Sequence, residues 1–181
     1  MGSRTKEISE KQQEFIADQK MFFVGTAASE GRVNVSPKGM STLRVLRPNK
    51  VVWLNLTGSG NETAAHLLQN DRITLMFCAF EGKPKILRLY GNAKVYHQRD
   101  SEYDDYIALF PEIEGSRQII TIEVDLVQKS CGFGVPLYDY QSERGLLGNW
   151  AAKKGKEKLE KYWADNNVKS LDGFETKIFE K

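Results

Sequence analysis

The fold of this chain is decided by the stretch MFFVGTAASEGRVNVSPKGMSTLRVLRPNKVVWLNL, residues 21–56. It holds four apolar or alternating segments, and in RVNVSPKG apolar and polar residues alternate with a period of two, as in a strand with one buried face. Residues that favour bends separate the segments, at Glu30-Gly31 and at Pro48-Asn49-Lys50. Four strands joined by tight turns predict an antiparallel sheet, because parallel strands need long crossover connections.

The rest of the chain adds strands and a few helices. A helix and then a fifth strand follow the fourth strand. Further strands are predicted at 85–97 and 117–133, and helices at 3–20 and 101–110. From residue 142 two helices follow, broken near Gly155. The pattern predicts a mainly β fold, a closed or nearly closed β-barrel with helices outside. We expect one domain over 1–181, with the barrel at about 21–135 and a C-terminal helical extension at about 141–181.

Composition excludes several classes of protein. The 26 basic and 24 acidic residues leave a net charge of +2, so we expect no nucleic-acid partner. Two cysteines without a cluster of histidines predict neither a disulfide scaffold nor a metal site. No apolar run reaches membrane-spanning length, and the polar beginning of the chain lacks a secretion signal. We therefore expect a cytoplasmic protein that does not bind membranes.

The segment LNLTGSGNETAAHLL, residues 54–68, is a candidate anion site. Ser59 and Glu62 have the spacing of a capping box, which predicts a helix that begins at Gly60. The first turn of a helix has unpaired amides and a partial positive charge, so a phosphate could bind there, although simple helix capping explains the same residues. The cation would be Lys38, which shares a strand face with Ser36 while Pro37 points away and indicates an edge or a bulge.

Three segments resemble a known family in order and spacing: GRVNVSPKG, VVWLNLTGSGNETAAHLLQNDRITLMF and ILRLYGNAKVY. They are similar to the pyridoxamine 5′-phosphate oxidase-like flavoproteins over roughly residues 13–127. CGFGVPLYDY, residues 131–140, resembles the tail of an uncharacterised branch of that family. The resemblance implies a split β-barrel that forms a homodimer and binds FMN in a cleft shared by both subunits.

The turn between the strand and the helix of residues 54–68, called the hinge from here on, and the family resemblance together predict a set of cofactor-binding residues. By this resemblance, residues 36–38 match the strand that runs along the flavin ring, and residues 55 and 57 match the strand end that precedes the phosphate. Residues 61–63 match the turn that binds the phosphate, and residue 88 matches a position that is often basic in the family. The expected residues are Ser36, Pro37, Lys38, Asn55, Thr57, Ser59, Gly60, Asn61, Glu62, Thr63 and Arg88.

The sequence departs from the vitamin B6 oxidases at two places. Those enzymes carry adjacent Arg and Lys where this chain has Glu62-Thr63, so amides, hydroxyls, Lys38 and Arg88 would have to meet the phosphate. They also end in a strand whose arginine holds the substrate phosphate, whereas this chain ends in LDGFETKIFEK. We therefore do not expect oxidation of vitamin B6.

Two functions remain open. The first is an FMN-dependent oxidoreductase of unknown substrate, with a nicotinamide nucleotide as a candidate electron donor and no catalytic residue assigned. The alternative is a non-catalytic split barrel that carries or senses a flavin, a deazaflavin or haem. His66 and His97 are expected at surface or capping positions. Residues 131–140 either close the barrel or form a lid over the flavin, with Tyr138 and Tyr140 as the residues to watch.

Overall fold

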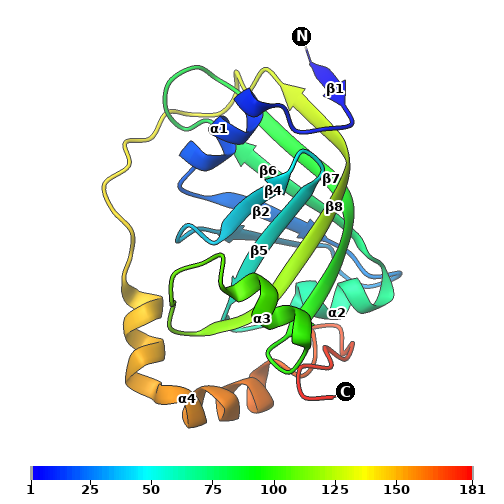
Figure 1. The fold of residues 1–181 in the computed structure, drawn as a ribbon, viewed down its shortest axis with the longest axis vertical. Coiled ribbons are helices and arrows are strands. Elements are labelled where there is room, and N and C mark those ends of the chain that lie inside the picture. The colour runs from blue at the N-terminus through cyan, green and yellow to red at the C-terminus, as the bar shows by residue number, and fades with distance from the viewer. Residues whose placement is uncertain (1, 181) are drawn as a thin grey trace.

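The computed structural model describes residues 2–180 and shows a curled antiparallel sheet with helices around it (Figure 1). The strands are β1 (Ser3–Thr5), β2 (Phe22–Thr26), β3 (Asn34–Lys38), β4 (Leu43–Arg47), β5 (Lys50–Leu56), β6 (Arg72–Cys78), β7 (Ile86–His97) and β8 (Ser116–Ser130). The helices are α1 (Glu10–Asp18), α2 (Glu62–Gln69), α3 (Ser101–Ile107) and α4 (Leu146–Asn166).

The strands follow the order β3-β2-β6-β7-β8-β5-β4, with β1 added to β8, and neighbouring strands are antiparallel. The prediction of a mainly β barrel with outer helices is therefore confirmed. β3 lies at one edge of this order, where Pro37 faces Phe23 of β2 across the ladder. The edge position suits proline because its missing N–H would be needed in an inner strand.

The barrel interior is filled by large apolar side chains from both halves of the sheet. Phe22 stacks on Phe77 with ring centroids 5.7 Å apart and meets Trp53 edge-on at 6.2 Å. Ile120 and Ile122 of β8 are fully buried in the same cluster. Burying each such side chain contributes about 2 kcal/mol, which makes the sheet a firm support for the loops at its ends.

The first helix begins later than the predicted residue 3. Residues 3–5 form β1, and the helix starts only at Glu10, where Ser9 and Gln12 cap it reciprocally. β1 gains ladder bonds to β8, and this long-range pairing outweighs the local preference for a helix.

The predicted break in the C-terminal helices is confirmed at Gly155, whose φ of 72° and ψ of 165° are open to glycine and costly for other residues. In Figure 1 α4 runs below the barrel and the final segment, in red, lies beside α2. Within residues 2–180 the longest helices are too polar to cross a bilayer.

Residues 131–145 leave the barrel as an extended loop that leads to α4 (Figure 1). Tyr138 packs on Phe80 with ring centroids 5.4 Å apart, and Phe133 and Leu137 are exposed. The aromatic residues of this loop thus lie outside the barrel and do not fill its interior.

Candidate anion-binding site

A cavity of about 630 Å³ lies between β3, the hinge after β5, the beginning of α2 and the C-terminal segment. Most of its lining residues are polar or charged, and they come from distant parts of the sequence. The lining residues are Arg32, Val33, Asn34, Ser36, Lys38, Asn55, Gly58, Ser59, Gly60, Asn61, Glu62, Thr63, His66, Arg117, Asn166, Lys169, Ser170 and Leu171.

The cavity brings together most of the residues expected to bind a cofactor. Those at its wall are Ser36, Lys38, Asn55, Ser59, Gly60, Asn61, Glu62 and Thr63. Ser36 and Lys38 share one side of β3, and Pro37 is exposed on the other side, as the alternation of the strand predicts.

Thr57 and Arg88 stand apart from this wall. The Thr57 hydroxyl lies behind the hinge, where it donates to the carbonyl oxygen of Gly115 and accepts from the indole of Trp163. Arg88 belongs to β7 in the middle of the sheet, and its guanidinium donates to the hydroxyl of Ser130 at 3.3 Å. Within one chain, Arg88 is therefore a neighbour of β8 and does not reach the cavity.

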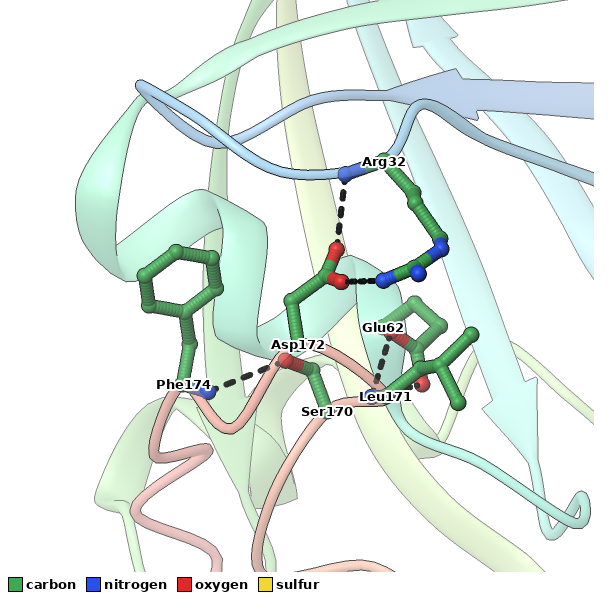
Figure 2. A network of polar contacts seen from close by, with 6 residues as sticks. All are labelled: Arg32, Glu62, Ser170, Leu171, Asp172 and Phe174. Atoms are coloured by element: carbon green, nitrogen blue, oxygen red, sulfur yellow. Dashed lines mark hydrogen bonds and ion pairs between the residues drawn. The ribbon is translucent and has the colours of Figure 1, made fainter.

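The predicted capping box at the hinge does not form. α2 begins at Glu62, two residues later than expected, and Asn61 occupies the cap position without a capping hydrogen bond from its side chain. The carboxylate of Glu62 instead accepts from the amide of Leu171, at 3.0 and 3.1 Å (Figure 2). The C-terminal segment thus supplies the donor that the Ser59 amide was expected to provide.

The hinge keeps its backbone amides free for a ligand. Within residues 2–180, the amides from Gly58 to Ala64 donate no hydrogen bond to the protein. Amides in the first turn of a helix carry the positive end of its dipole. Because Glu62 is held by Leu171, its negative charge is partly compensated, and the hinge presents amides to the cavity.

Two cations face the cavity, Lys38 and Arg117. Burial, with the nearby charge of Arg117, lowers the pKa of Lys38 from 10.5 to about 8. Burial also lowers the pKa of Arg117 to about 10, so both groups are mainly charged at neutral pH. Neither forms an ion pair with an acid within residues 2–180. Two charges held together without an acid favour an anionic ligand between them.

Unpartnered polar atoms gather in the same place. Five buried side-chain atoms lack a hydrogen-bond partner in the described part of the chain: Ser36 Oγ, Asn55 Oδ1, Asn61 Oδ1, His66 Nε2 and Arg117 Nε. All five belong to residues that line the cavity. Leaving a buried polar atom unpaired costs about 1–3 kcal/mol, so five in one cavity indicate a site built for a polar ligand.

Sequence reasoning missed Arg117 and misplaced His66 and His97. Both histidines are buried, and His66 Nδ1 lies 3.1 Å from the Thr26 hydroxyl, while Nε2 of this cavity-lining residue has no partner within residues 2–180. Burial, then the charge of Arg99, lowers the pKa of His97 to about 4, which keeps that ring neutral. The available signal for Arg117 was a charged residue at the beginning of the most apolar strand, IITIEV.

The C-terminal segment lines one side of the cavity with Lys169, Ser170 and Leu171, and Figure 2 shows the polar contacts that hold this segment. The carboxylate of Asp172 accepts from the amide of Arg32 at 2.7 Å and pairs with its guanidinium. The hydrogen bond from the Arg32 amide is the main reason that the pKa of Asp172 is lowered. Ser170 accepts from the amide of Phe174, which folds the segment into a turn over α2.

Fold and site together define a split β-barrel with a cationic, amide-lined cavity at the beginning of α2. Residues 8–131 match the family model described as pyridoxamine 5′-phosphate oxidase. The chain therefore belongs to the pyridoxamine 5′-phosphate oxidase family.

A curated relative and two solved structures extend this comparison. The pyridoxamine 5′-phosphate oxidase family protein ustO of Aspergillus flavus is 37% identical over 184 residues, covering 92% of this chain and 74% of that protein. A HupZ variant from Group A Streptococcus is 16% identical with a TM-score of 0.55, covering 68% of this chain and 99% of its own. The haem storage protein HutZ of Vibrio cholerae is 18% identical with a TM-score of 0.50, covering 70% and 97%. At these identities the two solved structures support the fold alone.

Proposed function

We propose that this protein binds FMN, with the phosphate in the cavity at the beginning of α2, and that it is an oxidoreductase of unknown substrate. The observation that carries the proposal is the convergence of five unpartnered buried polar atoms on one cavity that also holds Lys38 and Arg117. Donors for a phosphate come from the hinge amides and the two cations. Acceptors such as Asn55 Oδ1 and Asn61 Oδ1 suit the hydroxyl groups of a ribityl chain.

In this proposal the residues of the chain bind and orient the cofactor. The flavin supplies the transfer of electrons, and a reduced nicotinamide nucleotide is the electron donor that we propose. The hinge amides and Arg117 anchor the phosphate, and β3 presents Ser36 and Lys38 along the adjoining wall. Arg88 and Pro37 lie outside the cavity of their own chain, and in a homodimer with a shared cleft they would contact the cofactor of the partner.

An absorption spectrum of the purified protein, followed by FMN titration, tests this proposal. We expect a yellow protein, or a colourless one that takes up one FMN per chain and quenches its fluorescence. Bleaching of the bound flavin by a reduced nicotinamide under anaerobic conditions, and return of the colour with an acceptor, would support the oxidoreductase. A protein that neither contains nor takes up FMN contradicts the proposal.

The second candidate is a non-catalytic barrel that carries haem, a flavin or a deazaflavin. One observation favours haem: His66 Nε2 is buried, unpartnered and at the cavity wall, and an imidazole nitrogen is a common ligand of haem iron. Haem titration distinguishes the two functions. The haem carrier would be selected if the wild-type protein gives a Soret band with haem, loses it in His66→Ala, and takes up no FMN. Stable binding of flavin without turnover would select a flavin carrier.

A further inference from the structure

The C-terminal extension lies outside the part of the chain that matches the family model, which ends at residue 131. It nevertheless contacts the hinge through Trp163, Asn167 and Leu171. The indole of Trp163 donates to the Thr57 hydroxyl at 2.9 Å, and the amide of Leu171 donates to Glu62. A segment beyond the residues that match the family model therefore holds the turn on which the proposed phosphate site depends.

Asn167 is the centre of these contacts. It follows α4, is fully buried, and its side-chain amide donates to the carbonyl oxygen of Gly58 at 3.2 Å. Its own carbonyl oxygen accepts from the side chain of Asn61 at 3.1 Å and from the hydroxyl of Thr176 at 2.6 Å. One residue thus fixes both sides of the glycine-containing turn and connects it to the last segment of the chain.

Asn167 also orients the buried cation. Arg117 Nη1 donates to Asn167 Oδ1 at 2.6 Å and to the carbonyl oxygen of Gly60 at 3.0 Å, while Arg117 Nε is left without a partner. Arg117 is only 3% exposed. These two acceptors hold one end of the guanidinium, and because both are neutral, its positive charge stays available to the cavity.

We propose that Asn167 is a positioning residue that makes the C-terminal extension part of the cofactor site: it aims Arg117 and turns the carbonyl groups of Gly58 and Gly60 away from the ligand. This inference rests on the proposed function, because it assumes that the phosphate of FMN occupies the cavity. It goes further by assigning phosphate selectivity to a segment beyond the family domain. A neutral acceptor is required here, since a carboxylate at position 167 would neutralise Arg117.

The experiment compares the affinities of FMN and riboflavin, which differ only in the phosphate, for the full chain and its variants. In Asn167→Asp the new carboxylate pairs with Arg117 and repels the carbonyl of Gly58, so we expect FMN affinity to fall at least about tenfold. Riboflavin affinity should stay within about twofold. Asn167→Ala, which leaves Arg117 without one acceptor, should lower the preference for FMN in the same direction and by less.

Thr176→Val is the matched control. It removes a buried hydrogen bond to the same Asn167 and leaves the contacts with Arg117 and Gly58 in place. We expect a lower thermal midpoint and an unchanged ratio of FMN to riboflavin affinity. Circular dichroism checks that each variant is folded. If Asn167→Asp does not fold, the affinities of Asn167→Ala decide the test.

The outcomes separate this inference from the proposed function. If the wild-type protein does not prefer FMN to riboflavin, the phosphate anchor is absent and both proposals fail. If the wild type prefers FMN and the folded Asn167 variants keep that preference, the proposed function stands and Asn167 has only a structural role. The positioning role would also be overturned if the Asn167 variants lost affinity for FMN and riboflavin equally. The same holds if Thr176→Val changed the ratio of FMN to riboflavin affinity as much as the Asn167 variants do.

Discussion

At the scale of single residues, Lys38 links the stability of the protein to binding. Its folded-state pKa of about 8 is below the ordinary value of 10.5, so folding alone makes the charged form less favourable. Below about pH 8 the ammonium is charged in both states, and burial costs the folded state about 3 kcal/mol. Between about pH 8 and 10.5 the unfolded chain binds more protons, so this cost disappears as the pH rises. An anion in the cavity favours the charged form.

We therefore predict opposite effects of Lys38→Met on stability and on affinity. The variant keeps an apolar stem beside Trp53, over whose ring Lys38 Nζ lies at 5.2 Å, and loses the buried charge. Without ligand it should be more stable than the wild type at pH 7, with a difference that shrinks between pH 8 and 10.5. The FMN affinity of the variant should be about tenfold lower than that of the wild type at pH 7. Near pH 8 the FMN affinity of the wild type should decline as Lys38 loses its proton, whereas that of the variant should not change.

Urea unfolding and fluorescence titration across this pH range measure both effects. Lys20→Met is the control for the loss of a lysine charge away from the cavity, and it should change neither affinity nor its pH dependence. Equal FMN affinity of Lys38→Met and wild type would remove Lys38 from the site.

At the scale of elements, the pairing of β7 with β8 limits one position to glycine. The register of these strands shifts between Tyr90 and Gly91, and a Cβ atom at Gly91 would overlap the carbonyl oxygen of Glu123. The irregularity brings the two backbones close together, which only glycine permits.

We predict that Gly91→Ala destabilises the barrel by about 3 kcal/mol, because the strands must separate to admit the methyl group. Gly25→Ala in β2 is the matched control, since its Cβ would meet Thr74 at an ordinary 3.8 Å. That variant should be neutral or slightly stabilising. Thermal unfolding of both proteins measures the difference, and equal midpoints would contradict the predicted clash.

At the scale of the whole molecule, large apolar side chains remain exposed on the edge strand and on the loop 131–145. Val35 of β3 is 65% exposed and Phe133 is 82% exposed. Exposed apolar groups of this size often mark interaction surfaces. A homodimer would cover them, and the loop would then serve as a lid at the cleft of the partner, the alternative left open by the sequence.

We predict that sedimentation equilibrium gives twice the chain mass of 20.6 kDa. Val35→Asp should shift the protein toward monomer, because a carboxylate on the edge strand would be buried without a partner. Glu30→Asp, in the exposed turn before β3, is the control and should leave the mass unchanged. A wild-type protein that is monomeric at all concentrations would rule out the shared cleft.

Much of the architecture could be predicted because its signals are local. Period-two alternation predicts the strands, Pro37 predicts an edge position or a bulge, of which the structure shows the edge, and Gly155 predicts the break in the C-terminal helices. Each prediction needs only a few neighbouring residues. The juxtaposition of Lys38 with the hinge was predicted from the barrel, in which the second strand would lie beside the hinge. The beginning of α2 was predicted two residues early, because the Ser59–Glu62 spacing is typical of a capping box whether or not another donor is near.

What the sequence determined by itself is the barrel and the presence of a turn that leads into a helix after its fourth strand. Only the tertiary structure decided how that hinge is completed, because the contacts of Arg117 with Asn167 and of Glu62 with Leu171 join residues 50 and 109 positions apart. Local patterns carry no information about such pairs, since the curvature of the sheet and the return of the chain after α4 set the distances between them.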